Sequence, residues 1–403
     1  MRLRKRHRVY ISIAACVIAL SIASSGCLWL FERMPHKKWG FIDSNGVLVI
    51  PVKFDDVARD EYGGRTVYHK PFRNFSEGLC TVRIGKKWGY INNKGDFVIE
   101  AKYDGAGQFS EGLACVRDGK KYGYIDKAGI LVIPMEFDWP EPSGKASADN
   151  PDWDFTKLLL EPLVFSDGRA VAHIHGKCGY IDRTGKIVIE PVYVTANAFD
   201  QGYGVVTTPA GVEFIDTNGS PKAPDSHCVS FAEGLFLAHN GFYDPVKRRL
   251  FYLDKNGQRP FPQEYADARV FSEGLAAVSF GSKNLETNNS YGYIDTSGTM
   301  VIQPQFHVSG NNLAADFIDG RAIVSELSIG PTGHIKNLHG VIDRSGRWIV
   351  RPKYEHISSY SDGLARALRN SHWVFLDMDG NEVVQTTAAW VNSYSEGLAA
   401  VME

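Results

Sequence analysis

Carboxylates recur at one fixed position along this chain of 403 residues. Each lies in a Ser-Glu-Gly phrase or a close variant of it, as with Glu77, Glu111, Glu233, Glu273 and Glu396. Two carboxylates beside one sugar ring can drive glycoside hydrolysis. That chemistry needs a single constellation, whereas this residue repeats in register along the chain. We therefore interpret these carboxylates as turn residues beside a required glycine, and we predict no catalytic residues, no cofactor and a non-enzymatic protein.

His173, His175 and Cys178 are the best candidate metal ligands in the sequence. Residues i and i+2 of a strand face the same way, so both imidazoles could reach one ion. No fourth ligand follows at a telling spacing, and polar side chains are expected at the tip of a hairpin. We predict no metal site here.

Segments that do not repeat are the better candidates for binding. A segment rich in Pro, Asp and Ser carries Trp139 and Trp153, and further insertions cover residues 58–70, 282–290 and 330–337. Insertions in repeat proteins fall on loops, often on one face, where binding sites are common. We name Trp139 and Trp153 as a candidate ligand-binding loop. If the pair is exposed, a glycan ligand is favoured, and if it is buried, a protein partner is favoured.

The secondary-structure elements that carry these residues are predicted from a sequence motif that recurs nine times along the chain. One copy reads Lys87-Trp88-Gly89-Tyr90-Ile91-Asn92, followed by a Gly turn, an apolar return segment and a Phe-Ser-Glu-Gly-Leu phrase at residues 109–113. The shortest step between copies is 34 residues, and longer steps contain loops. The acid or amide that ends each first strand marks the copies: Asp43, Asn92, Asp126, Asp182, Asp216, Asp254, Asp295, Asp343 and Asp377.

Each copy predicts a small antiparallel meander. The aromatic and β-branched first segment suits a half-buried strand. In Asp126-Lys127-Ala128-Gly129 the Asp can bond backbone amides of the turn while Gly129 supplies the positive φ that closes it. A return strand and a third strand follow, and no helical periodicity competes. We therefore expect an all-β fold of about nine three-stranded meanders.

The repeated phrase resembles the WG-repeat (KWG-repeat) family. The signature is clearest at Lys38-Trp39-Gly40, Lys87-Trp88-Gly89 and Lys121-Tyr122-Gly123. The fourth copy has Cys178 in place of Trp, the fifth and sixth lose the aromatic-Gly pair, and the ninth lacks the Gly. The resemblance implies an all-β repeat module of bacterial proteins that mediates binding, and it supplies no catalytic residues.

The ends of the array leave two arrangements open. The first strand near residues 38–42 has no preceding partner, and the last, Leu398–Val401, has no following one. These edges are complementary, so a closed, propeller-like toroid could pair them. Nine units exceed the usual four to eight blades of a propeller, so we expect an open, twisted β-superhelix or solenoid and keep the closed toroid as the alternative.

The N-terminal residues predict an export signal. Five basic residues lie within residues 2–8, residues 9–23 are almost entirely apolar, and Ser24-Ser25-Gly26 leads into Cys27. This order is typical of a secretory signal, and it resembles a lipobox except that Ser24 stands where an aliphatic residue is usual. We expect residues 1–26 to be the signal, Cys27 to be lipidated, residues 27–37 to be a linker and residues 38–403 to be the repeat array. The alternative is an uncleaved membrane anchor, because the apolar stretch continues to Phe31.

Charge and cysteine content narrow the partners. Loss of residues 1–26 removes five basic and no acidic residues, which lowers the formal net charge from −2 to −7. A nucleic-acid partner is not expected, because it needs a basic face. We expect Cys80, Cys115, Cys178 and Cys228 to be buried apolar residues. The predicted protein is a non-enzymatic, membrane-attached scaffold of the cell envelope that binds another protein or the cell wall, and the alternative is glycan or peptidoglycan binding or processing on the same scaffold.

Overall fold

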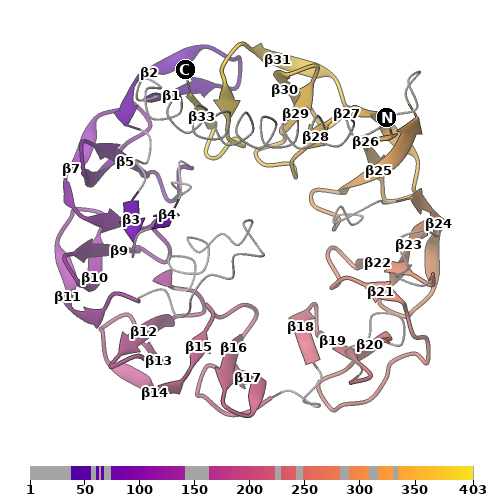
Figure 1. The fold of residues 1–403 in the computed structure, drawn as a ribbon, viewed down its shortest axis with the longest axis horizontal. Helices are drawn as coiled ribbons and strands as arrows, with labels where there is room; N and C mark the ends of the chain where they lie inside the picture. Colours follow the sequence, from indigo (N-terminus) through magenta and orange to yellow (C-terminus); the bar gives the residue numbers. More distant parts are fainter. Residues whose placement is uncertain are drawn as a thin grey trace, which may run out of the picture.

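The chain folds as a closed ring of nine small antiparallel sheets, which we call blades (Figure 1). The computed structural model describes residues 38–55, 60–62, 65–67, 74–140, 163–222, 228–241, 248–281, 290–307, 316–329 and 335–402. Every secondary-structure element assigned in these ranges is a β-strand, which confirms the expected all-β fold. A separate hairpin, β3 (Asp60–Tyr62) with β4 (Arg65–Val67), lies within the first insertion.

The blades follow one another along the chain. Blade 1 combines both ends of the array: β1 (Lys38–Asp43), β2 (Leu48–Asp55), β32 (Trp390–Val391) and β33 (Leu398–Met402). Blade 2 consists of β5 (Cys80–Ile84), β6 (Lys87–Ile91) and β7 (Phe97–Tyr103), and blade 3 consists of β8 (Gly105–Ala106), β9 (Leu113–Asp118), β10 (Lys121–Asp126) and β11 (Leu131–Asp138). Blade 4 consists of β12 (Ala170–Ile174), β13 (Lys177–Ile181) and β14 (Ile187–Tyr193). Blade 5 consists of β15 (Thr195–Ala196), β16 (Tyr203–Thr208) and β17 (Gly211–Asp216).

The remaining blades complete the ring. Blade 6 consists of β18 (Cys228–Ala232), β19 (Leu235–His239) and β20 (Leu250–Leu253), and blade 7 consists of β21 (Asp267–Ala268), β22 (Leu275–Ser279), β23 (Ser290–Asp295) and β24 (Met300–His307). Blade 8 consists of β25 (Arg321–Ile329), β26 (Ile335–Asp343) and β27 (Trp348–Tyr354). Blade 9 consists of β28 (His356–Ile357), β29 (Ala365–Arg369), β30 (His372–Leu376) and β31 (Glu382–Thr386).

Ring closure is achieved by pairing the first strand with the last. In blade 1, β1 runs antiparallel to β33 with Gly40 opposite Val401 and Ile42 opposite Ala399. Of the two expected arrangements, the closed toroid is therefore the one observed, and the expectation of an open superhelix is wrong. The physical reason is the complementarity of the two edges, since pairing them satisfies backbone groups that an open array would leave exposed.

Each blade spans the ring from its inner side to its outer rim. The short strands such as β21 and β28 lie on the inner side, and the return strands such as β7 and β11 form the rim (Figure 1). Every blade also has two ends along its strands. We call the end with the Asp-x-x-Gly and Ser-Glu-Gly turns the turn end, and the end with the connection between the Leu-Ala-x-Val strand and the WG strand the hairpin end.

The glycine of the WG signature is required by a close backbone approach. In six blades a Cβ at this glycine would lie 2.4–2.6 Å from a carbonyl oxygen of the return strand. The return strand bulges at this point, because Trp88 pairs with Tyr103 while Tyr90 pairs with Ile99. In blade 9 Val374 replaces the glycine, and there the ladder runs on without this bulge. The glycine positions are Gly40, Gly89, Gly123, Gly179, Gly292 and Gly340.

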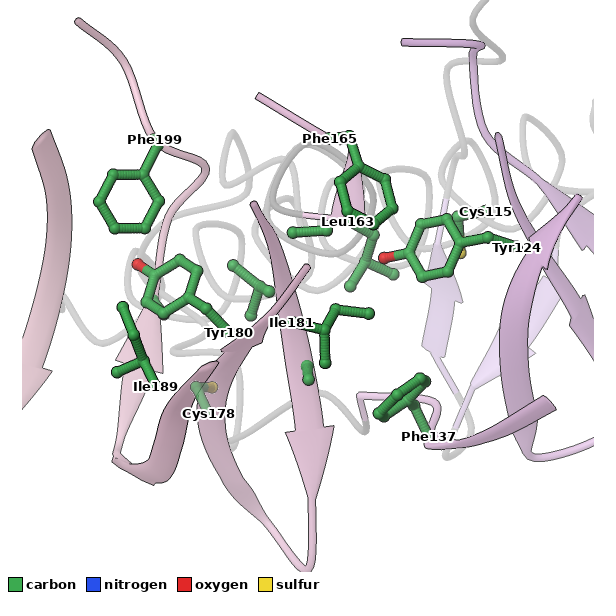
Figure 2. Packing of buried hydrophobic residues seen from close by; sticks show 14 of the residues in the cluster. Cys115, Tyr124, Phe137, Leu163, Phe165, Cys178, Tyr180, Ile181, Ile189 and Phe199 are labelled. Atoms are coloured by element: carbon green, nitrogen blue, oxygen red, sulfur yellow. The ribbon is translucent and has the colours of Figure 1, made fainter. Parts of the chain in front are cut away.

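The core lies between blades rather than inside any one of them. Tyr180 of blade 4 packs on Phe199 at the start of blade 5 with 4.7 Å between ring centroids, and Tyr124 packs on Phe165 in the same way (Figure 2). The Tyr180 hydroxyl also donates to the Asn197 carbonyl at 2.8 Å. The repeated aromatic residues are therefore core residues, and each blade is stable only against its neighbours.

Candidate binding face

The repeated carboxylates at the turn end tie each blade to the next. Glu111 stands at φ 52° and its carboxylate accepts the Gly168 amide of the following blade at 3.2 Å. This confirms the interpretation of these acids as turn residues and gives them a second role. The corresponding acid-to-glycine pairs are Glu77–Gly112, Asp167–Gly202, Glu233–Gly274, Glu273–Gly320, Asp362–Gly397 and Glu396–Gly78.

In four copies the serine beside the acid adds a further bond between blades. Ser110 Oγ donates to the Phe165 carbonyl at 2.6 Å, and Ser395 Oγ donates to the Phe75 carbonyl at 2.5 Å. The Ser395 bond and the Glu396–Gly78 pair both connect the last repeat to the first. The turn end thus carries the acid-to-glycine contact at seven of the nine junctions between blades, including the junction between the chain's two ends.

The nine acids or amides that mark the copies all shape their turns as expected. Asp126 Oδ1 accepts the amides of Ala128 and Ile130 at 3.0 and 2.9 Å, and Gly129 has φ +79°. A Cβ on Gly129 would also lie 3.1 Å from Ile99 of the preceding blade. The turn glycine is therefore needed both for its backbone conformation and for packing between blades.

The lysine of the KWG signature forms a clamp at the hairpin end. Lys87 Nζ lies 2.8 Å from Asp104 Oδ1, and the Gly119 amide of the next blade donates to Oδ2 of the same carboxylate at 2.8 Å. The Lys87 ammonium and the Gly119 amide lower the pKa of Asp104 below its usual value. Equivalent clamps are Lys38–Asp55–Gly85 and Lys121–Asp138–His175. The three clamps occur in the three copies with the clearest signature.

The inner strands at the hairpin end carry residues that do not repeat. The first residue of each two-residue inner strand is a different type in each blade: Gly105, Thr195, Asp267, His356 and Trp390. The second residue is buried in each of these strands and is small or aliphatic. The fold therefore constrains the second position and leaves the first free to vary, as expected of a position used for recognition rather than for folding.

A row of rings follows these positions across blades 8, 9 and 1, and we call it the seam cluster. It consists of His339, His356, Arg366, Trp373 and Trp390. Successive ring centroids are 6.4 Å apart from His339 to His356, 6.1 Å from His356 to Trp373 and 5.2 Å from Trp373 to Trp390. Trp373 is buried, whereas Trp390 keeps 39% of its surface exposed.

Arg366 lies against both tryptophans of the seam cluster. Its guanidinium carbon is 5.5 Å from the Trp373 centroid and 5.3 Å from the Trp390 centroid, which is cation–π range. Nη1 donates to the Val391 carbonyl, while the buried Nε has no hydrogen-bond partner. Within the described residues no carboxylate lies within 4 Å of this guanidinium, and burial lowers its pKa.

Trp139 is partly buried at the hairpin end of blade 3. Its ring lies 5.0 Å from the Arg117 guanidinium and 6.1 Å from the Tyr122 ring. Trp153, the other member of the candidate loop, and Cys27 lie outside the described residues. The structure therefore shows how Trp139 is held but not whether it forms a pair with Trp153.

The candidate metal ligands are separated by the hairpin. Strand β12 ends at Ile174 and His175 adopts φ 49°, so the expectation that His173 and His175 face one way along a strand is wrong. Burial lowers the pKa of His173 to about 4, and burial raises that of the Cys178 thiol to about 11. Cys178, like Cys80, Cys115 and Cys228, is buried and unbridged, as expected for apolar core residues. In the described ranges no group of three or more possible metal ligands gathers.

A small hollow of about 10 Å³, roughly the room that one water molecule needs, opens between blades 1 and 2 at the hairpin end. It is lined by the signature residues Trp39 and Trp88, by Asp55 of the first clamp, and by the buried Thr81 and Arg83. Sequence reasoning missed both this hollow and the seam cluster. The available signal was the short segment before each Phe-Ser-Glu-Gly phrase, where Trp390 and His356 depart from the small residues of other copies.

The insertions flagged in the sequence attach at the hairpin end. The described residues that border them include Asp55, Ser279, Ser290 and Ile329, and pairing places each of these at that end of its blade. The prediction that insertions share one face is therefore consistent with where the described chain enters and leaves them. The insertions themselves lie mostly outside the described residues.

A comparison with known protein families identifies the type of the repeat. A family model described as "WG containing repeat" matches residues 39–66, 72–88, 88–122, 122–141, 179–208, 291–326 and 340–373. These matches include the blades in which the WG glycine contacts the return strand. No curated protein matches the chain. The described part of the chain contains no helix with the length and apolarity needed to cross a bilayer.

Several solved structures are similar in outline only. A eukaryotic initiation factor matches with a TM-score of 0.49 and 11% identity over 91% of this chain and 98% of its own. Apo AztD from Citrobacter koseri gives 0.35 and 13% over 79% and 95%, and the Neurospora crassa Pan2 WD40 domain gives 0.30 and 12% over 60% and 88%. At these scores the likeness carries no inference about function.

Proposed function

Because this chain belongs to the WG-repeat family, we propose that it is a non-enzymatic binding scaffold of the cell envelope that meets its partner with the hairpin end of the ring. The contrast between the two ends carries this proposal. At the turn end the polar side chains bond the neighbouring blade, as Glu111 bonds Gly168. At the hairpin end the inner positions vary in type and Trp390 is exposed.

The envelope location is supported by sequence alone. Residues 1–26 have the order of an export signal and Cys27 follows small residues. We expect a palmitate analogue to label the wild-type protein and not Cys27→Ala. Labelling that survives the substitution, or a mature protein that still contains residues 1–26, would contradict lipidation and favour an uncleaved anchor.

Site-specific photo-crosslinking in intact cells tests which end meets the partner. A photoreactive phenylalanine analogue would replace Thr195 or His356 at the hairpin end, and Lys94 or Lys255 at exposed turns as matched controls. We expect adducts from the hairpin-end positions and none from the controls. Adducts that form equally from both ends, or only from the turn end, would show that the partner does not use the hairpin end.

A glycan partner is the second candidate. It is favoured by the exposed Trp390 ring beside an arginine with no carboxylate in reach among the described residues. Aromatic rings and arginine are the side chains that dominate binding energy at many interfaces, so the same observation also fits a protein partner. The chemistry of the seam cluster distinguishes a glycan partner from a protein partner.

A further inference from the structure

We propose that the seam cluster binds a sugar ring that carries a carboxylate, with Trp390 as the stacking platform and Arg366 as the partner of the carboxylate. This inference rests on the proposed function, because it names the ligand class at the same hairpin end. The evidence comes from the exposure of Trp390, the incomplete bonding of Arg366 and the independence of both from the repeat pattern.

Trp390 offers an apolar ring face of the size of a pyranose. It is the only tryptophan among the exposed large hydrophobic side chains of the described residues, at 39% exposure. Its neighbour Trp373 meets it edge-on, at 70° between ring planes and 5.2 Å between centroids, and fixes its orientation. A ring held in this way can stack on a flat apolar surface at little cost in side-chain entropy.

Arg366 supplies a charge that no carboxylate of the described structure neutralises. Its Nη1 bonds the Val391 carbonyl and its Nε has no hydrogen-bond partner. A guanidinium presents its donors in a planar fork that matches a carboxylate. Burial lowers the pKa of Arg366, which means that the cost of burying its positive charge is not offset by a nearby negative group among the described residues. A bound carboxylate would offset that cost.

The rest of the seam cluster is neutral and planar. Burial lowers the pKa of both His356 and His339, so neither imidazole adds a positive charge near neutral pH. The cluster therefore provides one cation beside several rings rather than a basic patch. This matches a single carboxylate on an otherwise neutral ligand better than a polyanion, which the negative net charge of the chain would repel.

The repeat fold does not require a tryptophan at position 390. The equivalent inner-strand residues are Gly105, Thr195 and Asp267, and their blades form in the same way. Arg366 does have a structural bond, since it reaches from blade 9 to β32 of blade 1. Trp390 is therefore the better position for a test, because its loss removes the platform and leaves the repeated contacts in place.

The test measures binding of aldotriouronic acid, a xylobiose that carries one glucuronic-acid residue and so a single carboxylate on a neutral oligosaccharide, to the full-length protein in detergent by titration calorimetry. The methyl ester of the same oligosaccharide is the ligand control. We expect the acid to bind, the ester to bind at least about tenfold more weakly, Trp390→Ala to lose about tenfold in affinity, and Trp390→Phe to keep most of it. Phe280→Ala, which removes another exposed aromatic ring that lies outside the seam cluster, should bind like the wild type.

Equal binding of acid and ester would overturn the role of Arg366, and unchanged binding by Trp390→Ala would overturn the site. A peptide with a free C-terminal carboxylate is the competing ligand class. If the peptide binds more tightly than the oligosaccharide and Trp390→Ala abolishes its binding, the sugar proposal is wrong. If the carboxylated sugar does not bind but crosslinks still form from the hairpin-end positions, the proposed scaffold function is supported and only the sugar-binding inference is wrong.

Discussion

The two ends of the ring use similar residue types for different purposes. At the turn end, carboxylates such as Glu77 and Glu111 each accept the amide of a glycine in the next blade. At the hairpin end, the clamp on Asp104 recurs in only three blades, and inner positions such as His356 and Trp390 follow no pattern. The comparison shows that repetition in this chain marks the residues that hold blades together, and that departures from it mark candidates for recognition.

The largest expected effect comes from the WG glycine. Gly123→Ala would place a Cβ 2.4 Å from the Ile133 carbonyl oxygen, so the return strand of blade 3 would have to move. We expect a loss of about 3 kcal/mol in the free energy of unfolding, measured by denaturant titration. Gly107→Ala is the matched control, because a Cβ there would lie no closer than 3.7 Å to a neighbouring atom. If the Gly123→Ala midpoint is unchanged, the close approach is not the reason for this glycine.

A smaller effect is expected at the turn glycine. Gly129→Val would force a β-branched residue to φ +79° and bring its Cβ to 3.1 Å from Ile99, at a cost of about 2 kcal/mol. Gly119→Val is the control, because Gly119 has φ +57° but nothing within 4 Å of its Cβ. The difference between the two thermal midpoints isolates packing between blades from backbone strain. Equal losses would mean that the contact with Ile99 adds nothing.

Sequence alone predicted the parts of the fold that repeat. The Asp-x-x-Gly phrase indicated the turn at Asp126, and the positive φ of Gly129 confirms it. The repeated glutamates were also correctly read as structural, since their positions within a fixed phrase left no room for a single catalytic site. Local phrases suffice for these features because the contacts that they make lie within one repeat or between consecutive repeats.

Closure and the seam cluster could not be read in the same way. Pairing of Gly40 with Val401 joins residues at opposite ends of the array, and no local pattern records the curvature that brings them together. The seam cluster draws His339, His356 and Trp390 from three blades, so its members have no shared spacing in the sequence. His173 and His175 failed as a pair because the hairpin turn begins between them.

The clamp at the hairpin end predicts a dependence on acidic pH. Lys87 and the Gly119 amide lower the pKa of Asp104 in the folded state, so its contribution is present above the unfolded pKa and is lost as pH falls through the folded one. We expect Asp104→Asn to cost about 1 kcal/mol at pH 7 and to lose less stability than the wild type below about pH 4. Parallel stability curves for the two proteins would contradict the clamp.

The smallest expected effect is at the exposed member of the seam cluster. Trp390→Ala should change the free energy of unfolding by about 0.5 kcal/mol or less, because its equivalents in other blades are as small as glycine. Thermal unfolding of the full-length variant measures this. A large destabilisation would mean that Trp390 belongs to the scaffold, and the contrast between the two ends of the ring would fail at its clearest position.

Closure of the ring is tested most directly by amide hydrogen exchange at β1. In the wild type, residues Trp39–Ile42 should be as protected as Trp88–Ile91, because both segments are paired on two sides. Deletion of residues 394–403 removes β33, so exchange at Trp39–Ile42 should become much faster while Trp88–Ile91 stays protected. Unchanged exchange at Trp39–Ile42 after the deletion would show that β1 does not depend on β33 and that the ring is open.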